Sequence, residues 1–184
     1  RAPAVTEAVR DLLNNRDGLM LGICNGFQAL IKLGLVPYGD IVPMTAECPT
    51  LTFNTIGRHQ SRLVRTRVAS NLSPWLAKTE VGDMHTIAIS HGEGRFVASD
   101  DMLAQLKANG QIATQYVDEA GVPGMDLSVN PNGSLLAIEG ITSPDGRVFG
   151  KMGHSERYSN GTFKNVPGEK DQPLFAAGVE YFTA

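Results

Sequence analysis

The sequence predicts an α/β fold, with a mixed, mainly parallel sheet flanked by helices, and three observations support this prediction. A short apolar run at residues 19–23 leads through a Gly-rich turn into a helical pattern at residues 26–34. Further short apolar runs alternate with helical segments along the chain, an order typical of α/β proteins. Hydrophobic residues make up 42% of the 184 residues and charged residues 19%, the proportions of one globular domain.

Helices are predicted where apolar residues recur every three or four positions. In residues 4–14, Val5, Val9 and Leu12 share one face, so this segment is expected to be an amphipathic helix. Further helices are expected at residues 26–34, 101–109 and 174–182. The first of these ends at Gly34, a residue typical of helix C-termini.

Strands are predicted at short apolar or alternating runs. These runs are residues 19–23, 63–68, 86–90, 111–117, 136–141 and 148–152. The last two are joined by Ser143-Pro144-Asp145-Gly146, which has the composition of a hairpin turn. Residues 37–50 contain three prolines and are expected to form a loop.

Charge and composition exclude several classes of protein. The net charge is -3, whereas proteins that bind nucleic acid through its phosphates usually carry a basic excess. No apolar run approaches the ~20 residues that span a bilayer. Two cysteines and no visible signal peptide indicate a reducing, cytoplasmic location. We therefore expect no nucleic-acid partner and no membrane association.

The strongest single feature is the segment Gly22-Ile23-Cys24-Asn25-Gly26 between a strand and a helix. A nucleophile flanked by glycines in such a turn is a nucleophile elbow. The following helix start would favour the thiolate of Cys24, and the backbone N–H of Asn25 can face an oxyanion. A buried structural cysteine in a Gly-rich turn is the alternative.

A cysteine nucleophile needs a general base held by a third group. His154 and Glu156 are two residues apart, a spacing that on an extended segment places both side chains on one face. His91 and Glu93 repeat this spacing and compete for the role. A zinc site made from the two pairs matches no compact ligand motif, so no metal is expected.

These segments together resemble the class I, or triad, glutamine amidotransferases. The family pattern G-x-C-x-G-x-Q followed downstream by H-x-E is matched by Gly22 to Gln28 and by His154-Ser155-Glu156. The segments Ser90-His91-Gly92-Glu93-Gly94-Arg95 and Asn130-Pro131-Asn132-Gly133-Ser134 are similar to the glutaminase domain of phosphoribosylformylglycinamidine synthase. The resemblance extends from about residue 19 to residue 160.

The resemblance implies a flavodoxin-like fold and a cysteine mechanism. Cys24 would attack the side-chain amide of glutamine, while His154, oriented by Glu156, moves the proton to the leaving ammonia. A glutamyl thioester would form and be hydrolysed. The residues implied to bind the substrate glutamine are Gln28, Ser90 and His91.

The resemblance also implies a partner. In such enzymes ammonia passes to a synthetase domain, which uses ATP and Mg to convert formylglycinamide ribonucleotide to the amidine in purine biosynthesis. The glutaminase domain itself is expected to need no cofactor. Because the chain begins with Arg1 and has 23 residues before Cys24, we expect residues 1–184 to be a C-terminal fragment of a large single-chain synthase.

Three departures from the family pattern matter. The upstream Gly-Gly turn, which usually supplies a second oxyanion donor, is not in this sequence, so the fragment alone is expected to be inactive or incompletely folded. Phe27 stands where many relatives carry a small residue. Ser155 replaces a common proline, and the loss of proline frees φ, so the geometry of His154 and Glu156 is less fixed by the sequence.

Two alternatives remain beside the amidotransferase. One is another cysteine hydrolase with the same elbow, such as a γ-glutamyl peptidase. The other is a truncated domain that only docks on its synthetase, although the intact Cys24, His154 and Glu156 count against degeneration.

Overall fold

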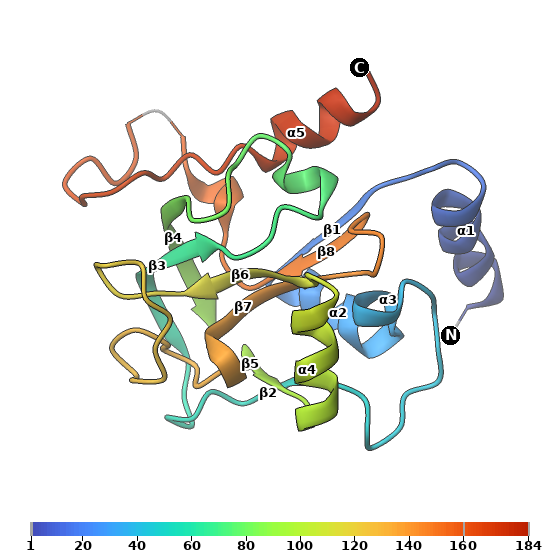
Figure 1. Cartoon of the computed structure of the whole chain (residues 1–184), viewed down its shortest axis with the longest axis horizontal. Helices are drawn as coiled ribbons and strands as arrows, with labels where there is room; N and C mark the ends of the chain where they lie inside the picture. The colour runs from blue at the N-terminus through green and yellow to red at the C-terminus, as the bar shows by residue number, and fades with distance from the viewer. Residues whose placement is uncertain (1, 160, 184) are drawn as a thin grey trace.

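The computed structural model describes residues 2–159 and 161–183 (Figure 1). Its elements in chain order are α1 (Pro3–Asn14), β1 (Met20–Ile23), α2 (Asn25–Leu33), α3 (Leu35–Tyr38), β2 (Thr50–Thr52), β3 (Gln60–Val68), the 3-10 helix η1 (Pro74–Leu76), β4 (Met84–His91), β5 (Arg95–Val97), α4 (Asp100–Ala108), β6 (Ile112–Tyr116), η2 (Leu135–Ala137), β7 (Ile138–Thr142), β8 (Val148–Lys151), η3 (Ser155–Arg157) and α5 (Leu174–Tyr181). The α/β class and all the predicted helices and strands are confirmed.

The main sheet has six strands in the order β1-β8-β7-β6-β3-β4. It is mixed, as expected, but the expectation of mainly parallel strands is wrong for the described residues. Among the strands that the structure describes in this sheet, only β1 and β8 run parallel, and the other four pairings are antiparallel. The reason lies in the connections: a tight hairpin joins β7 to β8 and only η1 lies between β3 and β4, whereas parallel neighbours need a longer crossover.

Two short features of the fold were not predicted from the sequence. Strands β2 and β5 form a separate antiparallel pair, and each has only three residues, too few to show a period. The short helix α3 was not predicted. It contains Pro37, which was counted among the prolines of the loop expected at residues 37–50.

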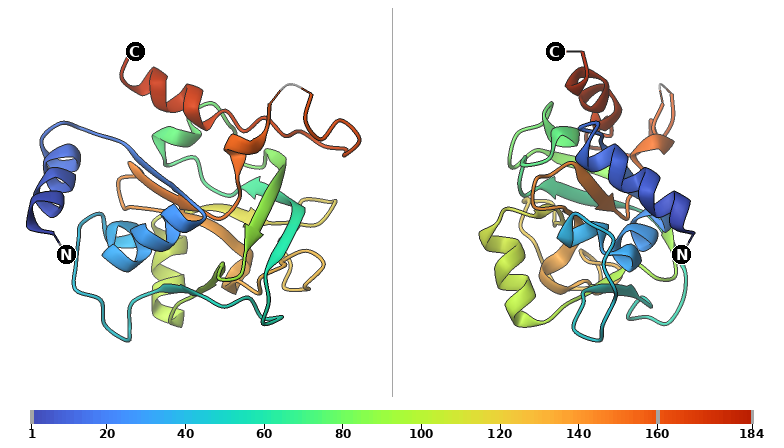
Figure 2. Two further views of the ribbon diagram at one scale, coloured as in Figure 1. Left: turned by 180° about the vertical axis from the view of Figure 1, so that it is seen from behind. Right: turned by 90° about the vertical axis from the view of Figure 1, so that its right-hand side faces the viewer.

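Helices cover both faces of the sheet (Figures 1 and 2). Helices α2, α3 and α4 lie on one face, and α5 lies on the other. Neighbouring residues of one strand accordingly belong to different core clusters: Val148 packs with the α2 side and Phe149 with Leu174 of α5. Within the described residues, no helix has the length and apolar character needed to cross a bilayer.

Two glycines let α2 approach the sheet closely. A Cβ atom at Gly150 would lie 2.2 Å from the ring of Phe27, and one at Gly22 would lie 2.7 Å from the backbone of Gly26. The N-terminus of α2 is therefore held directly against the ends of β1 and β8. The strand at the far edge of the sheet, β4, also contacts the segment that follows β8, since Ala88 forms an isolated bridge with His154.

Candidate active site

Cys24 occupies a strained turn at the end of β1. It is the N-cap of α2, with φ 53° and ψ -104°, a conformation that non-glycine residues rarely adopt. Its N–H donates to the carbonyl of Lys151 at 2.8 Å, which fixes the turn to β8. A side chain at Gly22 would clash, as the elbow predicts, but a Cβ at Gly26 would meet nothing within 4 Å. The steric reason therefore holds for the first glycine only.

The thiol of Cys24 is half-buried and donates to the carbonyl of Ser90 at 3.6 Å. Burial raises the pKa of the thiol above its ordinary value, and a hydrogen bond from the backbone N–H of Asn25 acts in the opposite direction. The helix start favours the thiolate as expected, but burial outweighs it. The thiol in this structure therefore needs a base to become a nucleophile.

His154 and Glu156 form the predicted pair. The His154 Nδ1 lies 2.5 Å from the Glu156 Oε1, and since a carboxylate only accepts, the ring nitrogen is the donor. The pairing arises differently from the expectation: His154 is the N-cap of η3, so the segment is a tight turn and not an extended strand. The other ring nitrogen, Nε2, is buried without a hydrogen-bond partner among the described residues.

The structure brings Cys24 and His154 to one place through their neighbours. Ile23 pairs with Lys151 in the parallel register of β1 and β8, three residues before His154. Strand β4 contacts both groups, because the carbonyl of Ser90 accepts the Cys24 thiol and the carbonyl of Ala88 accepts the His154 N–H. The charges of Arg157 and Glu156 also act on the Cys24 pKa, though less than its burial does. A thiol and a free imidazole nitrogen therefore share one end of the sheet.

The competing histidine, His91, is used differently. It is 4% exposed, and its Nδ1 lies 3.2 Å from the Oδ1 of Asn54 and not against Glu93. Burial, followed by the nearby His59, lowers the pKa of His91 to about 4. Gly94 lies flat on its ring, since a Cβ there would be 2.4 Å from the Cε1. His91 is thus neutral at pH 7 and is packed as part of the loop.

A network of polar side chains holds residues 90–95 beside the thiol. Gln28 donates through Nε2 to the carbonyl of Glu93 at 2.6 Å. Asn132 donates to the carbonyl of Gly94 at 2.6 Å, and the Ser134 hydroxyl donates to the same oxygen at 3.3 Å. The two motifs of the sequence resemblance therefore meet, and Gln28 braces this loop.

Sequence reasoning missed Asn54, whose side-chain amide bonds both the backbone carbonyl and the ring Nδ1 of His91. It also missed the partner of Ser90, whose hydroxyl lies 3.1 Å from the Nε2 of His59. Nothing in the local pattern distinguishes Asn54 from a surface asparagine. The substrate-binding roles of Gln28, Ser90 and His91 stay predictions.

Both cysteines are free, as expected for Cys24. Cys48 lies in the loop before β2, where the N–H of Thr45 donates to its sulfur at 3.4 Å. This hydrogen bond, followed by those from the Thr45 hydroxyl and Tyr38, lowers the pKa of the Cys48 thiol.

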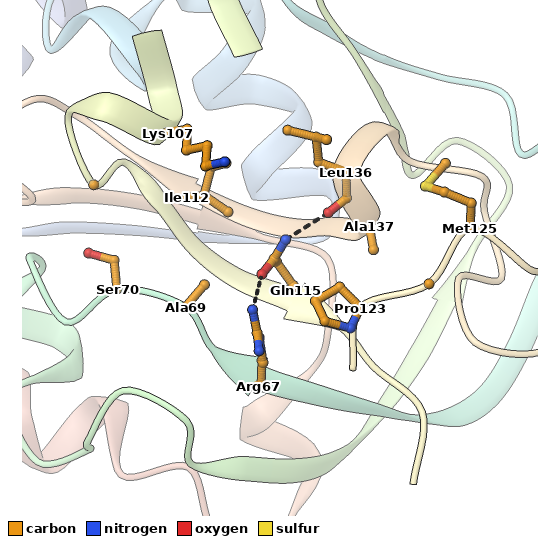
Figure 3. Close-up of a pocket in the computed structure, with 12 residues that line it drawn as sticks. Arg67, Ala69, Ser70, Lys107, Ile112, Gln115, Pro123, Met125, Leu136 and Ala137 are labelled. Atoms are coloured by element: carbon orange, nitrogen blue, oxygen red, sulfur yellow. Dashed lines mark hydrogen bonds between the residues drawn. The ribbon is translucent and has the colours of Figure 1, made fainter. Parts of the chain in front are cut away.

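A cavity of about 500 Å³ lies apart from these residues (Figure 3). It is lined by parts of β3, α4, β6 and η2, and none of the predicted site residues borders it. Arg67 reaches its wall and bonds Gln115, whose amide bonds the carbonyl of Leu136. Among the described residues, no group of three or more His, Cys, Asp or Glu side chains is placed to hold a metal ion.

Comparison with known proteins gives a consistent set of similarities. Residues 1–182 match the model of the CobB/CobQ-like glutamine amidotransferase domain. The chain is 39% identical to phosphoribosylformylglycinamidine synthase subunit PurQ of Aquifex aeolicus, over 76% of this chain and 56% of that protein. It is 37% identical to the same subunit of Symbiobacterium thermophilum, over 100% of this chain and 70% of that protein. A solved structure, PurLQS from Thermotoga maritima, superimposes with a TM-score of 0.65 at 28% identity, covering 96% of this chain and 71% of the other.

Proposed function

We propose that this chain, which belongs to the CobB/CobQ-like glutamine amidotransferase family, is a glutaminase domain that releases ammonia from glutamine for purine biosynthesis. The observation that supports the chemistry best is the free Nε2 of His154. This nitrogen is buried and has no hydrogen-bond partner among the residues that the structure describes, while the opposite nitrogen of the ring is bonded to Glu156. That is the arrangement of a general base whose tautomer is set by a carboxylate.

The first step is attack by Cys24 on the side-chain amide carbon of glutamine. His154 takes the thiol proton through Nε2, and Glu156 stabilises the imidazolium that forms. This step matters more here than in sites with a low-pKa thiol, because burial raises the pKa of Cys24. We assign the stabilisation of the developing oxyanion to the backbone N–H of Asn25, which bonds the neighbouring sulfur in the free site.

Collapse of the tetrahedral intermediate breaks the carbon–nitrogen bond. His154 gives its proton to the departing nitrogen, so ammonia leaves and a glutamyl thioester stays on Cys24. Water, deprotonated by the same imidazole, then attacks the thioester carbon. Glutamate leaves and the thiol of Cys24 regains its proton.

The ammonia is destined for a synthetase that carries out the ATP-dependent and Mg-dependent step on formylglycinamide ribonucleotide. The relatives are named as subunits of that enzyme, and the similar solved structure is titled as the PurLQS assembly. The single-chain arrangement expected from the sequence stays a prediction. The mass of the native enzyme decides it: a partner synthetase that separates under denaturing conditions contradicts the single chain.

The test is covalent labelling with a diazo-ketone analogue of glutamine, followed by intact mass and peptide mapping. We expect one adduct on Cys24, none on Cys48, and protection by excess glutamine. Labelling that glutamine does not block would favour a different cysteine hydrolase, which a γ-glutamyl peptide should then protect. Absence of any adduct on Cys24, in this chain and in the native enzyme alike, would contradict the assignment.

A further inference from the structure

A buried lysine and a buried glutamate lie beside the segment that carries His154. Lys151 ends β8 and Glu139 lies in β7, and both side chains are 0% exposed. The Lys151 Nζ lies 3.7 Å from the Glu139 Oε1. An ion pair withdrawn from water is a poor source of stability compared with apolar residues of the same volume. Its presence next to a reactive site therefore points to a role in holding that site.

The lysine bonds both residues that flank the histidine, and the glutamate bonds one of them. The Lys151 Nζ donates to the carbonyl of Gly153 at 3.0 Å and to the hydroxyl of Ser155 at 2.8 Å. The Gly153 N–H donates to Glu139 at 2.5 Å. The backbone on either side of His154 is therefore fixed by buried partners, which leaves mainly its side-chain torsions to set the ring position.

Ser155 completes this arrangement. Its hydroxyl accepts from Lys151 and donates to the Oε1 of Gln172 at 2.7 Å, while the hydroxyl of Thr114 donates to the second oxygen of Glu139. Ser155 stands where the sequence resemblance led us to expect a proline, whose ring fixes φ. Buried hydrogen bonds fix the residue here instead.

We propose that the Lys151–Glu139 pair positions the imidazole of His154 for its reaction with the thiol. The pair acts through the flanking residues, and neither charged side chain needs to touch the substrate. Lys151 also holds the nucleophile, since its backbone carbonyl accepts the N–H of Cys24. One residue of β8 thus anchors both reacting groups.

The two charges depend on each other. Burial lowers the pKa of Lys151, and the carboxylates of Glu139 and, more weakly, Glu156 oppose this change. His85 also senses the lysine, since its pKa is lowered by burial first and by Lys151 second. Removal of one charge alone leaves the other buried and unpaired, so the test removes both together.

The proposal rests on the glutaminase function, but the order of the imidazole can be observed without turnover. In the double variant Lys151→Met/Glu139→Gln, the amide keeps an acceptor for the Gly153 N–H while the charges are gone. We expect kcat to fall about 10- to 100-fold, because small displacements of a reacting group are costly, with KM changed by less than about twofold. The NMR signal of the His154 Nδ1–H, bonded to Glu156 in the wild type, should broaden or disappear.

Ser155→Pro then separates positioning from general damage. Ser155 is the first residue of η3, a position that proline fits without loss of a backbone hydrogen bond. In the wild-type background the substitution removes an acceptor from the buried lysine, so kcat should fall at least about fivefold. In the double-variant background no ammonium is present and the ring constrains φ, so proline should raise kcat and restore the histidine signal.

Leu106→Ala is the matched control, because Leu106 is fully buried in α4 and lies outside this network. It should lower the unfolding temperature yet leave the His154 signal unchanged. The proposal is wrong if the double variant keeps both the signal and a kcat within twofold of the wild type, or if Leu106→Ala loses the signal equally. If the wild type shows no turnover, in this chain and in the native enzyme alike, the proposed function fails, and the NMR comparison still decides the positioning role.

Discussion

The chain contains the same His-x-Glu spacing twice, and the two copies are used in opposite ways. At residues 154–156 the histidine bonds the carboxylate at 2.5 Å, and its other nitrogen has no hydrogen-bond partner within residues 2–159 and 161–183. At residues 91–93 the histidine is buried against the amide of Asn54, and the backbone of Glu93 accepts a bond from Gln28. One copy pairs its imidazole with a carboxylate, and the other pairs it with a neutral amide.

The difference lies in the backbone and in the kind of partner. In the 154–156 segment, His154 caps a 3-10 turn with φ -91° and ψ 79°, and its Nδ1 meets the carboxylate of Glu156 inside that turn. The 91–93 segment leaves a strand and bends so that Gly94 covers the ring. A carboxylate stabilises a charged imidazole, whereas a neutral amide does not. Spacing in sequence therefore offers the pairing, and the local turn decides whether it forms.

The substitutions with the largest expected effect replace each of the two histidines by asparagine. His154→Asn should lower glutaminase kcat by about 10⁴- to 10⁶-fold, as loss of a catalytic base does elsewhere, with little change in unfolding temperature. His91→Asn should do the reverse, losing about 2–4 kcal/mol of unfolding free energy through a cavity and lost hydrogen bonds. Steady-state kinetics and urea unfolding measure both. A larger kinetic loss for His91→Asn would exchange the two roles.

Removal of each carboxylate is the next test. Glu156→Gln leaves an amide that favours the wrong ring tautomer, so kcat should fall about 10²- to 10⁴-fold. Glu93→Gln should change kcat by less than about twofold, since only the backbone of that residue is engaged. Equal effects of the two substitutions, measured at saturating glutamine, would remove the distinction between the copies.

The pH dependence of the unfolding free energy tests the role assigned to His91. Its pKa is lowered by burial from 6.5 to about 4, so the unfolded chain binds the extra proton between these values. Stability from this residue is therefore complete above pH 6.5 and is lost as the pH falls toward 4, by on the order of 3 kcal/mol. Unfolding free energy measured from pH 7 to pH 4 should fall less steeply in His91→Asn than in the wild type. Parallel curves for the two proteins would show that His91 does not carry this pH dependence.

The smallest expected effect concerns the loop support. Asn132→Ala leaves the carbonyl of Gly94 with only its weaker bond from Ser134 and removes a partner of Tyr116, which should lower unfolding free energy by about 1–3 kcal/mol. Asn71→Ala, on the exposed surface, should change it by less than about 0.5 kcal/mol. Urea unfolding of the two variants checks the ranking, and equal losses would show that the buried asparagine does not hold the loop.

Much of the fold could be predicted because periodicity and turn residues act locally. The helix at residues 4–14 became α1 and the Gly34 terminus of α2 has φ 88°, as a C-cap requires. The sheet direction could not be predicted, since it depends on which strands become neighbours. Strands β2 and β5 were invisible because a three-residue strand has no period.

Within the site, the reactive residues were predictable because each belongs to a motif with a stated chemistry. The residues that hold them in place could not be predicted. Lys151 and Glu139 have the pattern of ordinary strand residues, and charged side chains are usually exposed, so no pattern in the sequence places them in the interior. The serine at position 155, expected to loosen the geometry, is instead bonded on both sides.

The two thiols of the chain form an unusual chemical contrast. Burial raises the pKa of Cys24, while the Thr45 N–H lowers that of Cys48. A small alkylating reagent with no shape preference should therefore modify Cys48 first, and a glutamine-shaped reagent should modify Cys24 first. Each molecule thus carries an internal standard, because comparison of labelling at Cys24 and Cys48 by the two reagents reports whether the site around Cys24 is formed, whatever the amount of protein.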